Sequence, residues 1–320
     1  TTLDGTAITL ASTVDGAHNL TLNSSGATNF NGNVGSDAPI GTGTGAALTI
    51  NSGGTTDFNG TLETASGITQ ANGAGAVTLA ENVTTAAGDT ATTFDADTTL
   101  DGMTFTGGGN VTFGIAGGDT LTINTAPSTI DTSTAGTDVT VTDATTLNSD
   151  LSVNTGNGAL SITGNVNGAN NLTLTSVAGN VDIALVGDTT DIGILDVNTT
   201  SGNLTLNKDI NTAGNIQFDG VGGSIALNKG ATSTVTLTTG ADFTSNAASF
   251  ASNAADAEDL TITADGSVTL GAVNLNGGTT DGDLTVTADN DDNGTQTLQI
   301  TDNIQNVNIA TLSGGGTGAS

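Results

Sequence analysis

One short phrase, an apolar residue followed by threonine and a second apolar residue, recurs from end to end of this 320-residue chain. Alternation with a period of two residues is the pattern of a β-strand that buries one face. Copies of the phrase stand at residues 20–22, 48–50, 77–79, 121–123, 172–174, 204–206, 235–237, 260–262 and 284–286. Recurrence on this scale predicts a repeat architecture, and that prediction constrains the fold more than any single residue does.

The clearest internal repeat aligns residues 19–34 with residues 47–62. The matched pairs, which all keep the same spacing, include Leu20 with Leu48, Gly26 with Gly54, and Phe30 with Phe58. The phrase at Val77 follows Leu48 after almost the same interval, so the period is expected to continue. Asn-Gly, Gly-Gly and Asp-Gly pairs punctuate the strands, as sharp corners require. Stacked Asn and Thr side chains are expected to hydrogen-bond from coil to coil.

Later in the chain the spacing between equivalent apolar residues of successive coils, the coil step, shortens to roughly 19 to 24 residues. This is still in the range of a solenoid coil. The apolar ladders with this step are Leu160, Val181, Leu204 and Ile225; Leu172, Ile194, Ile216 and Val235; and Leu260, Leu284 and Val307. Interleaved ladders indicate a coil with two or three strands per turn. We therefore predict an all-β fold, an elongated parallel β-helix (solenoid) with coils of roughly 20–28 residues, on the order of 12 to 15 in number.

A single solenoid domain is expected over residues 1–311, with longer coils before about residue 110 and a flexible tail or linker at 312–320. Residues 35–46 are expected to form a surface loop. Residues 241–259 depart from the period of two, because their apolar residues follow a spacing of 4, 3 and 4. That spacing fits a short amphipathic helix or a looped-out excursion, and strand-and-loop is the alternative.

Composition excludes several classes of function. The formal net charge is −30, with 32 acidic residues against 2 Lys+Arg, and such a surface repels nucleic acid and anionic membranes. The absence of cysteine excludes disulfide and Cys-zinc chemistry. No apolar run approaches the roughly 18 residues of a membrane span. The start at Thr1 without Met suggests a processed protein or a piece of a longer one.

The best candidate metal site is an acidic segment near the end of the chain. Asp289, Asp291, Asn293 and Gly294 match the first half of a calcium loop, in which alternating oxygens and a glycine turn suit a hard cation. Ile300 stands where the loop would need its bidentate acid. An acidic solvated turn is therefore the alternative, and no cofactor other than calcium is expected. Residues 280–283 form a weaker candidate.

Catalysis has little support, and we do not expect an enzyme. Lyase chemistry on acidic sugars needs Lys or Arg, and this chain offers Lys208 and Lys229, which are separated by one coil step and could stack on adjacent coils. His18 has no partner in the sequence and is expected to be a surface residue. A carbohydrate-active β-helix enzyme is kept as a distant alternative, because the fold alone does not exclude one.

The Thr-x-Thr triplets resemble the threonine ranks of β-helical ice-binding proteins. Their first threonines are Thr140, Thr236, Thr261 and Thr285. The intervals between them are unequal, since the first is far longer than the other two. Unequal intervals predict poor register between coils, which favours ordinary outward-facing strand threonines over ice binding.

Residues 202–220 (GNLTLNKDINTAGNIQFDG) and 158–183 resemble the repeat regions of filamentous haemagglutinin-type adhesins, which are bacterial surface proteins built on right-handed parallel β-helices. This resemblance implies an extracellular stalk or adhesin. Abundant Thr, Ala, Gly, Asn and Asp without Cys also resembles S-layer proteins, which implies a calcium-dependent lattice subunit.

Together these features predict a secreted or cell-surface bacterial structural protein that forms a rigid rod, filament or adhesin stalk. Open strand edges at the ends of a β-helix invite pairing with other chains. We expect end-to-end self-association or a homo-oligomer, with carbohydrate or a host surface as a further partner. Nucleic acid and membrane insertion are not expected.

Overall fold

A computed structural model describes residues 1–71, 73–86, 90–115, 118–230, 232–245, 249–252, 257–276, 280–291 and 296–314. The chain forms a parallel β-solenoid of about 13 turns, and the described residues contain no helix. The predicted fold class is therefore confirmed. The chain divides into two compact units, residues 1–164 and 165–320. The single domain expected over residues 1–311 stays a prediction.

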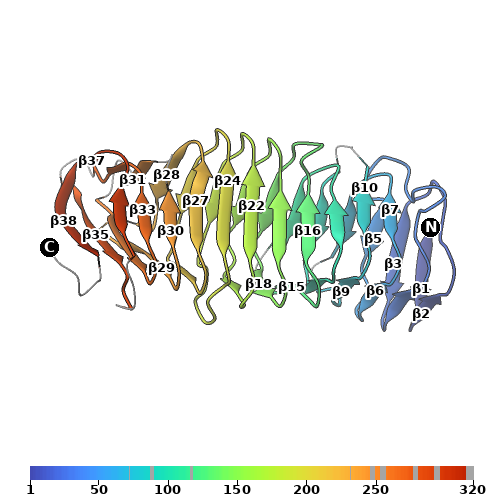
Figure 1. The fold of residues 1–320 in the computed structure, drawn as a ribbon. Helices are drawn as coiled ribbons and strands as arrows, with labels where there is room; N and C mark the ends of the chain where they lie inside the picture. Colours follow the sequence, from blue (N-terminus) through green and yellow to red (C-terminus); the bar gives the residue numbers. More distant parts are fainter. Residues whose placement is uncertain are drawn as a thin grey trace. The chain divides into compact units, whose positions relative to one another are not determined.

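In unit 1 the strands form three parallel sheets, and most coils contribute one strand to each. The first sheet contains β1 (Thr2–Gly5), β3 (Leu20–Ser24), β5 (Leu48–Ile50), β8 (Ile68–Gln70), β11 (Thr92–Phe94), β14 (Val111–Phe113), β17 (Val139–Val141) and β20 (Leu160–Ile162). The second contains β2 (Ile8–Leu10), β4 (Thr28–Phe30), β6 (Thr56–Phe58), β9 (Val77–Leu79), β12 (Thr98–Leu100), β15 (Thr120–Ile123) and β18 (Ala144–Leu147). The third, part of which is seen in Figure 1 as β7, β10 and β16, contains β7 (Leu62–Thr64), β10 (Val83–Thr85), β13 (Thr104–Thr106), β16 (Ser128–Asp131) and β19 (Leu151–Asn154).

Unit 2 repeats this arrangement. Its first sheet contains β23 (Val181–Ile183), β25 (Leu204–Leu206), β28 (Ser224–Leu227), β31 (Ser249–Ser252), β34 (Val273–Asn274) and β37 (Ile304–Gln305). β21 (Val166–Asn167) is the last strand of the second sheet. A separate five-stranded sheet contains β26 (Ile210–Thr212), β29 (Thr234–Thr239), β32 (Asp259–Ala264), β35 (Gly282–Ala288) and β38 (Val307–Gly314). The third sheet contains β22 (Leu172–Ser176), β24 (Leu195–Thr199), β27 (Ile216–Val221), β30 (Phe243–Ser245), β33 (Val268–Leu270) and β36 (Leu298–Ile300).

The core of each unit is built from the alternate residues that face inward. In the phrase Leu48–Ile50 both apolar residues are 0% exposed, and the threonine between them is half-buried. Aromatic residues stack from coil to coil in the same way. The rings of Phe30 and Phe58 lie parallel with centroids 4.7 Å apart, because the two residues are register partners on β4 and β6.

Outward-facing polar residues also stack. The Asn51 side-chain amide donates to Asn23 Oδ1 at 3.1 Å, and Asn23 donates in turn to Asp4 at 2.9 Å. In unit 2, Asn228 donates to Asn207 at 2.7 Å. These ladders hold equivalent corners of neighbouring coils together.

The coils differ in length, but the strands stay in register except for shifts within the β24–β27 and β35–β38 pairs. Leu48 pairs with Leu20 in the preceding coil and with Ile68 in the following one, although the stretch from Leu20 to Leu48 is clearly longer than the stretch from Leu48 to Ile68. The variation lies in the corners, which leave the strands untouched. The expectation that Val77 continues the ladder of Leu48 is wrong, because Val77 lies on the second sheet and pairs with Thr56.

The expectation of poor register among the Thr-x-Thr triplets is wrong for three of the four, whereas Thr140 lies on β17 of the first sheet. Thr236, Thr261 and Thr285 are register partners on β29, β32 and β35, and the second threonines of the same triplets pair likewise. The long interval that separates Thr140 from the other three reflects a different sheet, and the two nearly equal intervals among those three correspond to one coil each. A rank of half-buried threonines is also the ordinary outer face of such a sheet, and the register alone assigns no ligand.

Residues 241–259 contain strands where they are described. β30 and β31 both fall in this range and carry the buried Phe243 and Phe250. A helix is excluded for these described residues, and the strand-and-loop alternative holds there. Residues 246–248 and 253–256 lie outside the described residues. Of the predicted tail, residues 312–314 belong to β38, and residues 315–320 lie outside the described part of the chain.

The segment 35–46, predicted to be a surface loop, is partly built into the fold. Ile40 is 2% exposed and forms a parallel bridge with Thr64 of β7. Exposed residues precede it at 36–37 and 39 and follow it at 42–45. The loop is thus anchored by one inward apolar residue.

Candidate functional site

The predicted calcium ligands lie at and beyond the end of β35. Asp289 follows this strand with φ 55°, is 2% exposed, and donates its backbone N–H to Gly266 O at 3.0 Å. Asp291 is exposed, and Asn293 lies outside the described residues. Within the described ranges, no three acidic or histidine side chains converge to hold a metal ion. Calcium at Asp289, Asp291 and Asn293 stays a prediction.

The weaker acidic candidate, residues 280–283, takes part in contacts between coils. Asp283 donates its backbone N–H to Asp259 Oδ1 at 2.8 Å. Its own carboxylate accepts from Asn308 Nδ2 at 3.0 Å. These contacts give the acidic side chains of this corner a structural role.

The two lysines occupy equivalent corners but have different surroundings. Asn207 and Asn228, which precede them, stack on each other, as the single coil step between the lysines predicts. Lys229 Nζ lies 2.6 Å from Asp209 Oδ2 and also donates to Thr234 O at 2.7 Å. No ion pair of Lys208 is present among the described residues. Lys229 is therefore held within its own corner by Asp209 and Thr234.

Replacing Lys229 with methionine is expected to lower the free energy of unfolding of unit 2 by about 1 to 2 kcal/mol, since it leaves Asp209 without its cation. The side chains of this pair are 25% and 32% exposed, so the loss should shrink in high salt. Lys208→Met removes the same charge and is the matched control, with little expected change. Denaturant titration of both variants measures the difference, and equal losses would contradict the assigned ion pair.

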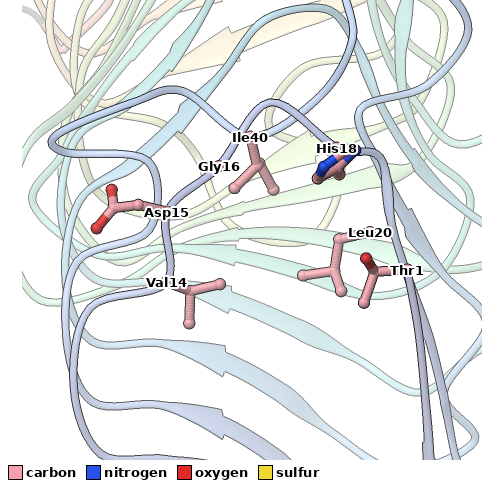
Figure 2. A pocket seen from close by; sticks show the side chains of 7 residues that line it. All are labelled: Thr1, Val14, Asp15, Gly16, His18, Leu20 and Ile40. Atoms are coloured by element: carbon pink, nitrogen blue, oxygen red, sulfur yellow. The ribbon is translucent and has the colours of Figure 1, made fainter.

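His18 lies at the first coil beside a small cavity (Figure 2). The cavity has a volume of about 130 Å³ and is lined by Thr1, Val14, Asp15, Gly16, His18, Leu20 and Ile40. In Figure 2 the Asp15 carboxylate points away from His18. Asp15 Oδ1 instead accepts the backbone N–H of Asp37 at 3.0 Å. The acid and the imidazole are not arranged as a catalytic pair, and His18 is exposed as expected.

One unusual side chain was missed by motif-based reasoning. Asp143 lies in the two-residue corner between β17 and β18, is 1% exposed, and has no hydrogen-bond partner at either carboxylate oxygen among the residues that the structure describes. The alternation of buried residues continues through it, from Val141 to Thr145. That alternation is the signal that could have identified it, because it places a carboxylate at an inward position.

Comparisons of the chain with protein-family models, curated proteins and solved structures found no match. The resemblance to adhesin repeats therefore carries no support beyond the shared solenoid architecture. The described residues include no helix with the length and apolarity that crossing a bilayer requires.

Proposed function

We propose that this chain is a structural protein of the bacterial cell surface, in which stacked β-coils form a rigid rod, filament or adhesin stalk. The observation that carries the proposal is the continuous parallel pairing of coils in each unit, with apolar residues inward and small polar residues outward. Such a stack resists bending because each coil is hydrogen-bonded to its neighbours along the sheets. Secretion fits the charge of −30 and the absence of cysteine.

Self-association would use the first and last strands. On β2, Ile8 and Leu10 are half-exposed, unlike the buried apolar residues of β4. On β36, Leu298 and Ile300 are half-exposed as well. Strands at the end of a stack offer unpaired backbone groups and apolar side chains to another chain. A second copy with the same coil geometry would hydrogen-bond to these backbone groups and cover these apolar side chains.

Negative-stain electron microscopy and light scattering of the full chain at increasing NaCl test this proposal. We expect end-to-end association that increases with salt, because salt screens the repulsion between strongly acidic chains. A two-dimensional sheet would instead favour an S-layer-like lattice. Chains that stay monomeric at every protein and salt concentration would contradict the assembly.

A lysine substitution on a terminal strand tests whether the contact between chains is made by the ends of the stack. Ile8→Lys places a cation on the terminal strand β2 and is expected to prevent association. Ile115→Lys makes the same change at a position that is 65% exposed and lies within the stack of unit 1. This control should associate normally. Loss of association in both variants would indicate a charge effect rather than an end contact.

A further inference from the structure

The corner at Asp143 combines features that conflict at neutral pH. An ionised carboxylate that is buried without hydrogen bonds is strongly unfavourable. In most proteins a nearby cation or several backbone N–H groups would compensate. The only basic side chains of this chain are Lys208, Lys229 and His18. None of the three is among the charged groups that act on Asp143.

Two glycines in neighbouring coils make room for Asp143. Gly114 has φ +75°, and a Cβ placed there would overlap Asp143 Oδ1 and lie 2.9 Å from Oδ2. A Cβ at Gly164, in the following coil, would overlap the Asp143 carbonyl oxygen. The hydroxyl of Thr142, next to Asp143, donates to the carbonyl of Gly114. The carboxyl group is thus held tightly against the backbone of the preceding coil.

The charged groups around Asp143 are all acidic. Asp95 and Asp97 belong to the corner between β11 and β12, and Asp119 belongs to the corner between β14 and β15. Asp95 Oδ1 accepts from the Ile115 backbone N–H at 2.8 Å, and Asp97 Oδ1 accepts from the Thr120 backbone N–H at 2.9 Å. The following coil, at Thr163 and Gly164, adds no titratable group.

Burial raises the pKa of Asp143 to about 6, and the charges of Asp119, Asp95 and Asp97 act in the same direction. The unfolded group would titrate near 3.8. Between these two pH values the folded chain binds more protons than the unfolded chain. This group therefore contributes stability that is fully present below pH 3.8 and is lost as the pH rises through about 6.

We propose that Asp143 is a proton-dependent lock on the corner between β17 and β18. When the carboxyl is protonated, it is neutral and can stay packed against Gly114. When it ionises, the unpaired charge drives the corner towards water and loosens its contact with the preceding coil. This coupling of proton uptake to coil closure is separate from the proposed structural role and does not depend on it.

Hydrogen exchange of unit 1 amides in the full chain, from pH 4 to pH 7.5, tests the lock after correction for intrinsic exchange rates. In the wild type the opening constant at Ile115 and Thr142 should rise about a hundredfold more across this range than in Asp143→Asn, whose side chain cannot ionise. Asp101→Asn is the matched control. Thr125 hydrogen bonds lower the pKa of Asp101, so this variant should retain the steep rise.

A direct measurement covers the case in which Asp143→Asn does not fold. The carboxyl carbon of Asp143 in the folded wild type, followed by NMR, should titrate near pH 6. Titration below about pH 4.5, or an unchanged pH dependence in Asp143→Asn, would overturn the lock. Stabilisation of the wild type but not the variant by added calcium at pH 7.5 would also overturn it, and would make Asp143 a cation ligand instead.

Discussion

Replacing Phe94 with alanine is expected to lower the free energy of unfolding of unit 1 by about 3 to 5 kcal/mol, the usual cost of emptying a buried aromatic site. Phe94 is 1% exposed. Its ring stacks on Phe113 with centroids 5.4 Å apart and meets Phe105 edge-on at 6.3 Å. Because Phe94 and Phe113 are register partners, collapse of the cavity would require the strands to leave their pairing.

Thr93→Ala is the matched control for this prediction. Thr93 is the preceding residue on the same strand, faces outward, and pairs with Thr69 and Thr112. Its replacement should cost no more than about 1 kcal/mol, the range of strand propensities. Denaturation of the full chain followed by circular dichroism gives the two losses. Similar losses would mean that the inward face of β11 is not the core that its alternation predicts.

The part of unit 1 that loses stability in Phe94→Ala can also be measured. In a solenoid, stability is approximately a sum over coils and over the interfaces between neighbours. Hydrogen exchange in Phe94→Ala should therefore accelerate most in the coils that contain Phe94 and Phe113, and less at β1 and β3. Uniform acceleration across unit 1 would instead indicate a single cooperative unit.

The stacked repeat could be predicted from sequence because the pleat of a strand fixes which residues face inward. Leu20 with Leu48 and Phe30 with Phe58, matched by spacing alone, are true register partners. The pattern also predicted that Asn side chains would stack. Each of these features depends on a period of two, which the fold preserves in nearly every strand.

The expected ladders failed in two ways, by a change of sheet and by a shift of register within one sheet. Val235, expected to follow Ile216, lies on β29 of another sheet, and Ile216 pairs with Phe243. Leu172 pairs with Leu195, one residue beyond the expected Ile194. Val307 pairs with Gly282, and Leu284 with Ala310, on either side of an irregularity in the pairing. An apolar-Thr-apolar triplet looks alike on all three sheets, and the corners vary in length. Spacing alone therefore cannot assign a strand to its sheet.

The burial of polar residues at inward positions was also not predicted. Thr28 and Thr56 are both 0% exposed, although threonine is outward in the repeated phrase. Asp143 is buried in the same way, whereas motif searches directed attention to the acidic segment at Asp289. A motif selects residues by chemical type. The position of a residue in the alternation, which decides its burial, was the more informative property here.

Gly54→Ala is expected to lower the free energy of unfolding of unit 1 by about 3 kcal/mol, because a single methyl group would force two coils apart. Gly54 has no unusual backbone angle. Its importance lies in the close approach of the coils, since a Cβ there would overlap the carbonyl carbon of Gly26 and lie 2.6 Å from its oxygen. A Cβ at Gly75, in the next coil, would likewise overlap the carbonyl of Gly54. The match of Gly26 with Gly54 in the sequence repeat thus has a steric cause.

Gly53→Ala separates this steric effect from the general effect of replacing glycine. A Cβ at Gly53 would meet only Ser25 O, at 3.8 Å, which is ordinary contact. Restricting the unfolded chain should make this control neutral or more stable by up to about 1 kcal/mol. Gly54→Ala is thus expected to lower the midpoint of denaturation, and Gly53→Ala to leave it unchanged or raise it. If both destabilised the chain equally, the corner would depend on glycine flexibility, and the close approach of coils at Gly26, Gly54 and Gly75 would not be the constraint that fixes these glycines.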